Sequence, residues 1–184
     1  AARAYLEKHG APIVVKADGL AAGKGVVVAM SNDEAFAAID MMLSDNKLGD
    51  AGARVVIEEF LTGEEASFIV MVDGKNVLPL ATSQDHKRLL DGDLGPNTGG
   101  MGAYSPEIHA RTLREVIMPT VQGMESEGIT YTGFLYAGLM ISPDGGIKVL
   151  EFNCRMGDPE TQPIMLRLKT NFLHIVEHAI NGTL

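Results

Sequence analysis

"KADGLAAGKGVVVAM", residues 16–30, combines a glycine-rich segment with two lysines, as loops that bind phosphate do. It fits neither of the common patterns for such loops. A Walker A loop has four residues between its glycines and a Ser or Thr after the lysine, whereas here Leu-Ala-Ala separates the glycines and Gly25 follows Lys24. A dinucleotide-binding fingerprint needs a third glycine that opens a helix. Gly25 instead opens the β-branched run Val26–Val28, which is typical of a strand.

The residues before this segment, Ile13–Val15, also have the composition of a strand, so the stretch is predicted to be a hairpin with a long glycine-rich tip. Such a flap can offer backbone N–H groups and lysine ammonium groups to an anion without the help of a helix dipole.

The composition of the chain indicates a globular protein. Its 184 residues are 46% hydrophobic, which is enough to form a sizeable core. The net charge of -9 argues against nucleic acid as a partner, because nucleic-acid-binding proteins carry a basic face, but it is compatible with a nucleotide. No apolar run approaches the length of a membrane span, so no membrane partner is expected. The single cysteine excludes an internal disulfide and fits a reducing compartment, which predicts the cytoplasm.

The predicted elements follow the order helix, hairpin, helix, strand, hairpin, loop, helix, hairpin, helix. This order indicates an α+β fold with mainly antiparallel strands, because a doubly wound parallel sheet would alternate strands and helices. Residues 1–60 are expected to form a small lid subdomain, and residues 61–184 a larger lobe built on an antiparallel sheet.

Local signals mark the ends of several helices. Ser31 and Glu34 have the spacing of a capping box, and residues 108–127 predict a helix interrupted at Pro119. The chain begins inside the amphipathic pattern AARAYLEKHG and stops directly after another predicted helix. We therefore expect it to be a piece of a longer protein.

The segment "LEFNCRMGDPETQP", residues 150–163, gathers polar groups at the end of the last predicted strand. Alternation along a strand places Glu151 and Asn153 on one face, and both offer the oxygen atoms that hard cations such as Mg²⁺ prefer. Arg155 follows on the same parity if the strand continues, where its guanidinium could bind a carboxylate or a phosphoryl oxygen. The alternative is a polar strand end that faces solvent. Cys154, on the opposite parity, is predicted to be a buried structural thiol.

Two further segments are candidate ligand sites, each with an ordinary alternative. In "IEEFLTGEE", residues 57–65, backbone groups could pair with a purine and a carboxylate with ribose hydroxyls, although composition alone favours a solvated acidic turn. Residues 84–106 are too long for a passive connection and are predicted to be a functional loop. In that loop Asp85–Arg88 concentrate charge, and Asn97–Gly102 would let backbone approach a small ligand. The alternative there is a flexible surface loop.

Six motifs in this order resemble the ATP-grasp superfamily, and within it the phosphoribosylamine–glycine ligases, also called glycinamide ribonucleotide synthetases. They are "KADGLAAGKGV", "EEFLTGEEASF", "SQDHKR", "GPNTGGMGAYSP", "TGFLYAGLM" and "EFNCRMGDPETQP". The resemblance implies an ATP-grasp fold, with ATP and Mg²⁺ or Mn²⁺ as cofactors. It implies ligation of glycine to 5-phosphoribosylamine through glycyl phosphate, a step of purine biosynthesis.

The resemblance also implies roles for individual residues. The implied ATP ligands are Lys16, Gly23, Lys24 and Gly25 at the phosphates, Glu58 and the backbone of Phe60 and Leu61 at the adenine, and Glu65 at the ribose. The implied metal ligands are Glu151 and Asn153, and the implied catalytic residue is Arg155, which would stabilise the transferring phosphoryl group. The implied ligands of glycine and phosphoribosylamine are Asp85, Lys87, Asn97, Thr98, Gly99, Gly100, Asp158, Pro159 and Glu160.

Two features depart from the pattern of the family. Many ATP-grasp enzymes place another metal-binding carboxylate on the preceding strand, whereas "YAGLMIS", residues 136–142, contains no acid. The N- and C-terminal domains of the family's enzyme are not expected within these residues, so we predict weak or no ligase activity from the chain alone. Two other functions stay open: an ATP-grasp ligase for another carboxylate, and a non-catalytic nucleotide-binding module.

Overall fold

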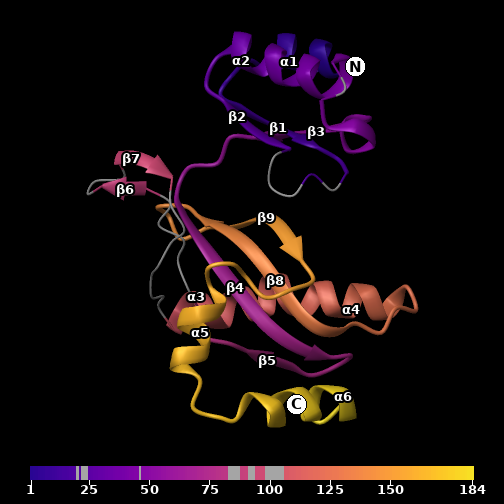
Figure 1. The fold of residues 1–184 in the computed structure, drawn as a ribbon, viewed down its shortest axis with the longest axis vertical. Coiled ribbons are helices and arrows are strands. Elements are labelled where there is room, and N and C mark those ends of the chain that lie inside the picture. The colour runs from indigo at the N-terminus through magenta and orange to yellow at the C-terminus, as the bar shows by residue number, and fades with distance from the viewer. Residues whose placement is uncertain (20, 22–24, 46, 83–87, 91–93, 98–105) are drawn as a thin grey trace. The chain divides into compact units, whose positions relative to one another are not determined.

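The computed structural model describes the chain except for residues 20, 22–24, 46, 83–87, 91–93 and 98–105. The chain divides into two compact units, unit 1 (Ala1–Leu61) and unit 2 (Thr62–Leu184). Each unit has its own antiparallel sheet, its own helices and its own core (Figure 1). The predicted α+β class is therefore confirmed.

Unit 1 packs helices on one face of a three-stranded sheet of order β2-β1-β3, in which neighbouring strands are antiparallel. In chain order its elements are α1 (Ala2–His9), β1 (Ile13–Ala17), β2 (Val26–Ala29), α2 (Asn32–Ile39), the π-helical η1 (Asp40–Ser44), the 3₁₀-helical η2 (Gly49–Gly52) and β3 (Val55–Glu59). The hairpin of β1 and β2 agrees with the predicted strand–loop–strand stretch, although part of its tip lies outside the described residues.

The helix α2 begins at the predicted capping box. The Ser31 hydroxyl accepts a hydrogen bond from the backbone N–H of Glu34 at 3.3 Å, and the Glu34 carboxylate accepts one from the N–H of Ser31 at 3.3 Å. These two bonds satisfy N–H groups that the first turn of a helix leaves without intrahelical partners.

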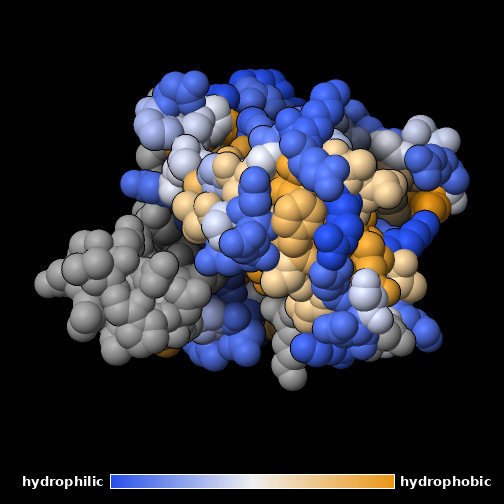
Figure 2. Space-filling view, turned by 90° about the horizontal axis from the view of Figure 1, so that it is seen from above, coloured by the Kyte–Doolittle hydropathy of each residue, from blue (hydrophilic) through white to orange (hydrophobic). Residues whose placement is uncertain are grey.

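Alternation along the strands gives the small sheet one buried face and one open face. The buried face and the helices form a core of Leu6, Ile13, Val15, Ala29, Ala35, Ala38, Ile39 and Met42. The open face carries Val26, Val28 and Val56, which remain 45%, 51% and 41% exposed. From above, the surface shows hydrophilic residues around smaller apolar areas (Figure 2).

Unit 2 is built on a four-stranded antiparallel sheet of order β5-β4-β8-β9. In chain order its elements are β4 (Glu64–Asp73), β5 (Val77–Pro79), β6 (Arg88–Leu90), β7 (Leu94–Asn97), α3 (Pro106–Thr112), the π-helical η3 (Leu113–Ile117), α4 (Met118–Ser126), β8 (Thr132–Ile141), β9 (Ile147–Asn153), α5 (Thr161–Arg167) and α6 (Phe172–Asn181). None of the helices in the described part of the chain has the length and apolar content needed to cross a membrane.

Both faces of the larger sheet are packed. On one face, alternate residues of β4 and β8 pack against η3 and α4 in a core of Ala66, Phe68, Val70, Val72, Val116, Ile117, Val121, Leu135, Ala137, Leu139 and Ile141. On the other face, Ile69 packs with Ile164 of α5, and Met71 packs with Ile175 and Ala179 of α6. We call the second face the α5 face.

Two sequence predictions need correction here. The segment expected to be a loop, residues 84–106, contains β6 and β7, which pair as a two-stranded sheet. The helix expected to be interrupted at Pro119 continues past it, from α3 through η3 into α4. A proline ring clashes with the carbonyl group four residues earlier. The wider π-helical turn η3 contains Glu115, the residue four positions before Pro119, and such turns accommodate a local irregularity without ending a helix.

A β-bulge in β9 changes which way its later side chains face. The register steps from the pair Leu139↔Val149 to the pair Gly138↔Glu151, so Leu150 is an extra residue in β9. Without the bulge, Val149 and Glu151 would share a face. With it, Glu151 lies opposite Gly138 and Asn153 opposite Tyr136, on the α5 face.

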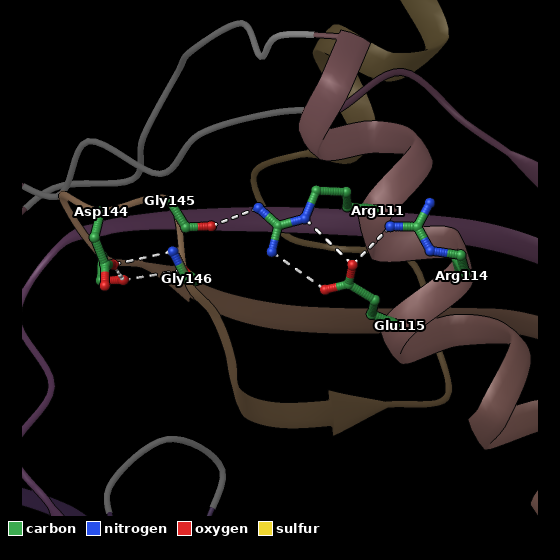
Figure 3. Close-up of polar contacts among 7 residues, drawn as sticks. Arg111, Arg114, Glu115, Asp144, Gly145 and Gly146 are labelled. Carbon is green, nitrogen blue, oxygen red and sulfur yellow. Dashed lines mark hydrogen bonds and ion pairs between the residues drawn. The ribbon is translucent and has the colours of Figure 1, made fainter.

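A polar cluster ties the turn between β8 and β9 to the helix formed by α3 and η3 (Figure 3). Arg111 donates to the backbone carbonyl of Gly145 at 2.7 Å and binds both carboxylate oxygens of Glu115, at 3.3 and 3.2 Å. Hydrogen bonds from Arg111 and Arg114 lower the pKa of Glu115. Within the turn, Asp144 accepts from the N–H of Gly146 at 3.1 Å. The turn between β8 and β9 is therefore held both by Arg111 of α3 and by the hydrogen bond within the turn.

Asp73, at the end of β4, links the β4–β5 turn to the last residue of the chain. Its carboxylate accepts from the N–H of Asn76 at 2.7 Å, from the Asn76 amide at 2.9 Å and from the N–H of Leu184 at 3.0 Å. Burial acts to raise the pKa of Asp73, but the hydrogen bonds from Asn76, Leu184 and Lys75 outweigh it and lower the pKa to about 2.

Asp73→Asn is expected to lower the free energy of unfolding by about 1–3 kcal/mol at neutral pH, because it removes charge-assisted hydrogen bonds. A folded-state pKa of about 2, against a usual 3.8, means that the carboxylate stabilises the fold fully above pH 3.8 and loses its contribution as pH falls through 2. Urea unfolding at pH 7, 4 and 2.5 should show the wild type and the variant converging as pH falls. A difference in stability that does not depend on pH would contradict this account.

Candidate functional site

In unit 1, the structure brings together two of the predicted ATP ligands. Lys16 on β1 and Glu58 on β3 form an ion pair with 2.7 Å between Nζ and Oε2. Both side chains lie on the open face of the small sheet, beside the exposed Val26 and Val56. An apolar surface next to an ammonium group and a carboxylate has the chemistry to bind a planar base and the polar parts of a nucleotide.

The remaining predicted ligands of unit 1 lie at the two ends of these strands. Gly25 precedes β2, and its carbonyl accepts from the N–H of Ala17 at 2.7 Å. Phe60 and Leu61 directly follow β3 and are half-buried. Gly23 and Lys24 lie outside the described residues, so their assignment to the phosphates stays a prediction.

In unit 2, Glu151 and Asn153 form a hydrogen-bonded pair at the end of β9. The Asn153 amide donates from Nδ2 to Oε1 of Glu151 at 2.9 Å. Glu151 is exposed and Asn153 half-buried. The structure thus confirms that alternation places the two side chains on one face, and the bulge at Leu150 determines that it is the α5 face.

The strand register adds Glu65 to this face. Glu65 on β4 pairs with Met140, two residues from Gly138, which pairs with Glu151. Since side chains two apart on a strand share a face, the predicted ribose ligand lies on the same side of the sheet as the Glu151–Asn153 pair.

The Glu151–Asn153 pair has the donor set for a hard divalent cation. A carboxylate and an amide both supply oxygen, and Mg²⁺ is commonly bound by one or two protein groups, with water and phosphate completing its shell. Within the described ranges, no three His, Cys, Asp or Glu side chains are grouped to hold a metal ion. The pair therefore fits a sparse site rather than a cage made by protein alone.

The residues that follow β9 differ from the sequence prediction. The strand ends at Asn153, so its alternation does not extend to Cys154 or Arg155. Cys154 is exposed, not buried as predicted, and lies beside the phenol of Tyr131, whose pKa is raised by burial and by this contact. Arg155 is also exposed, and its guanidinium donates to the carbonyl of Met156 at 2.8 Å. It keeps donors for a ligand, since a guanidinium carries five N–H groups.

The candidate substrate residues are spread over several elements. Asp158 is exposed, Pro159 is half-buried, and Glu160 is 4% exposed. Asn97 ends β7. The others lie outside the described residues, and the structure does not describe them: Asp85, Lys87, Thr98, Gly99 and Gly100.

Sequence reasoning missed the polar groups beneath the acid–amide pair. Ser67 on β4 donates to Oε1 of Glu160 at 2.7 Å, and the Tyr136 hydroxyl on β8 donates to the same oxygen at 3.2 Å. Burial raises the pKa of Tyr136 to about 12; the hydrogen bond with Ser67 opposes this rise, while the charges of Glu160 and Glu151 add to it. A serine in an apolar strand is a weak signal, so only the folded register could reveal this group.

Comparison with known proteins assigns the chain to a family. Residues 1–161 match the family model described as phosphoribosylglycinamide synthetase, ATP-grasp (A) domain. The phosphoribosylamine–glycine ligase of Ralstonia nicotianae is 71% identical over 189 aligned positions, which cover 100% of this chain and 45% of that protein. The enzyme of the same name from Pseudomonas aeruginosa is 70% identical, over 97% of this chain and 43% of its own length. The chain thus spans less than half the length of these relatives.

Solved structures agree with this assignment. The crystal structure of phosphoribosylamine–glycine ligase from Thermotoga maritima has a TM-score of 0.86 at 40% identity, covering 98% of this chain and 47% of that chain. The structure of L-amino acid ligase from Bacillus licheniformis has a TM-score of 0.64 at 20% identity, which shows the shared fold alone. The chain has the ATP-grasp fold and belongs to the family of the phosphoribosylglycinamide synthetase ATP-grasp (A) domain.

Proposed function

We propose that the full-length protein containing this chain is an ADP-forming ligase that joins glycine to 5-phosphoribosylamine in purine biosynthesis. The observation that carries the proposal is the Glu151–Asn153 pair, held by a hydrogen bond of 2.9 Å, in a chain that matches this ligase family over residues 1–161. The relatives' names supply the two substrates. The cytoplasm is the proposed location, in keeping with the single cysteine.

The proposed reaction has two steps. The carboxylate of glycine attacks the γ-phosphorus of ATP, and the bond from that phosphorus to the ADP oxygen breaks, which gives glycyl phosphate and ADP. The amine of phosphoribosylamine then attacks the acyl carbon, phosphate leaves, and the nitrogen loses a proton as the amide forms. Such transfers depend on positioning and charge neutralisation more than on covalent help from the protein.

We assign the residues of the chain to this reaction as the resemblance to the ligase family implies. Lys16 and Lys24, with the backbone of Gly23 and Gly25, bind ATP phosphates; Glu58, Phe60 and Leu61 bind the adenine, and Glu65 binds the ribose. Glu151 and Asn153 would hold Mg²⁺ or Mn²⁺, which supplies positive charge to the phosphates when bound. The exposed guanidinium of Arg155 stabilises the phosphoryl group in transfer.

Glycine and phosphoribosylamine are assigned to the remaining candidates: Asp85, Lys87, Asn97, Thr98, Gly99, Gly100, Asp158 and Pro159. Glu160 is left out of this set, because its carboxylate is buried and accepts a hydrogen bond from Ser67.

A coupled assay of ADP release tests the proposal. The full-length protein is expected to release ADP only when glycine and phosphoribosylamine are both present, whereas the 184-residue chain alone should show weak or no turnover. Reactions that lack one substrate serve as controls. If ADP release depends on a different carboxylate, that acid and not glycine is the substrate. Equal turnover by the two proteins would contradict the requirement for the rest of the parent chain.

A further inference from the structure

A buried polar group lies under the acid–amide pair, on the same face of the sheet. Ser67 and Glu160 are 3% and 4% exposed, and 2.7 Å separates the serine hydroxyl from Oε1 of the carboxylate. The Tyr136 hydroxyl lies 2.9 Å from the Ser67 hydroxyl and 3.2 Å from the same carboxylate oxygen. Three residues from β4, β8 and the start of α5 are thereby joined through one oxygen atom.

Gly138 lies between this group and Glu151. A side chain at position 138 would have its Cβ 3.2 Å from Cγ of Glu151 and 3.5 Å from Cε1 of Tyr136. The stem of the acid and the ring of the tyrosine therefore both border the space above the backbone of Gly138. Tyr136 is also the cross-strand partner of Asn153, and such partners have Cβ atoms about 4.5–5.5 Å apart. The ring thus borders both members of the acid–amide pair.

The polar group does not stabilise the core as apolar side chains would. A buried carboxylate is costly unless its oxygens are well bonded, and Oε2 of Glu160 has no hydrogen-bond partner among the described residues. What the group does achieve is orientation, because two hydroxyl donors on one oxygen fix the end of the Tyr136 side chain. A tyrosine ring held at its hydroxyl end cannot swing away from the residues beside it.

We propose that Ser67, Tyr136 and Glu160 are positioning residues that hold Glu151 and Asn153 in the arrangement that binds the divalent cation. This inference rests on the proposed function, since it concerns the metal ligands of that reaction. The hydroxyl-to-carboxylate bonds fix the ring of Tyr136, and the ring then limits the side-chain positions open to Glu151 across Gly138.

The test measures Mn²⁺ binding by the full-length protein in the presence of a non-hydrolysable ATP analogue, by electron paramagnetic resonance. Tyr136→Phe is expected to weaken Mn²⁺ binding about tenfold, the low end of the effect of residues that orient metal ligands. Affinity for the analogue without metal, measured in EDTA, should not change. Tyr131→Phe is the matched control: it also removes a half-buried hydroxyl, one that donates to the Phe134 carbonyl at 2.6 Å, and should bind Mn²⁺ as the wild type does.

Ser67→Ala provides a second variant, since it removes a donor to Glu160 with little change in volume and should weaken Mn²⁺ binding in the same direction. Wild-type Mn²⁺ affinity in both Tyr136→Phe and Ser67→Ala would overturn the inference, as would an equal loss in Tyr131→Phe. The outcome is separate from that of the ADP assay. Weaker Mn²⁺ binding in the two variants supports the positioning role even if glycine proves to be the wrong substrate.

Discussion

Replacing Glu151 by alanine is expected to lower kcat of the full-length protein about 100-fold or more. The exposed carboxylate lies next to Asn153 and is the charged member of the pair assigned to the metal. Its loss would remove a proposed oxygen ligand of the metal and the negative charge proposed to neutralise the cation. Losing a group that stabilises the charge developing in a transition state costs about 100- to 1000-fold in kcat.

Steady-state ADP release measures this effect, and Glu127→Ala is the control, because Glu127 is an exposed carboxylate just beyond α4. Binding of an ATP analogue should fall only in part, since the residues assigned to the base and ribose are untouched. Full turnover by the Glu151→Ala protein would instead show that Glu151 is not needed for ADP release, and would favour the alternative in which this chain is a nucleotide-binding module that takes no part in catalysis.

Gly63→Ala is expected to lower the free energy of unfolding by about 3 kcal/mol or more. Gly63 lies next to the boundary between the two units and has φ of +152°, which side chains rarely adopt. A Cβ there would lie 2.1 Å from the carbonyl oxygen of Ile141, far inside van der Waals contact. The pairing of Glu64 with Ile141, which begins the long contact of β4 with β8, would have to shift. Overpacking of this kind costs about 1–3 kcal/mol, and backbone strain adds to it.

Gly123→Ala is the matched control for this substitution. Gly123 lies inside α4, and a Cβ there would meet nothing within 4 Å. Alanine should therefore stabilise the helix by about 0.5–1 kcal/mol. Urea unfolding of the two full-length variants should shift their midpoints in opposite directions. A Gly63→Ala protein as stable as the wild type would show that the start of β4 is not packed as described.

Much of the fold was accessible from sequence because its signals are local. The capping box of Ser31 and Glu34 lies within one turn of helix. The hairpin of β1 and β2 is indicated by two β-branched runs that flank a glycine-rich segment. The acid–amide pair was also found from sequence, because alternation relates residues two apart whatever the rest of the chain does.

The features that were missed depend on contacts between distant segments. Ser67 and Glu160 are 93 positions apart, and neither has a neighbour in sequence that signals their hydrogen bond. The exposure of Cys154 depends on where β9 ends, which pairing with β8 sets. The helix past Pro119 was predicted to break because the rule for proline is local, whereas a wider turn in η3 lets the chain continue.

The extra residue Leu150 divides β9 into two stretches, and the odd-numbered side chains of the first stretch face the side of the sheet opposite to those of the second. Before it, Ile147 and Val149 lie opposite Ile141 and Leu139, on the face that packs against η3 and α4. After it, Glu151 and Asn153 lie on the α5 face. The first half of the strand can therefore vary for packing against the core, and the second half for the chemistry of the acid–amide pair, without either change forcing the other. Deletion of Leu150 would make β9 a regular strand and would still leave Val149 opposite Leu139 and Glu151 opposite Gly138, so each stretch would keep its face.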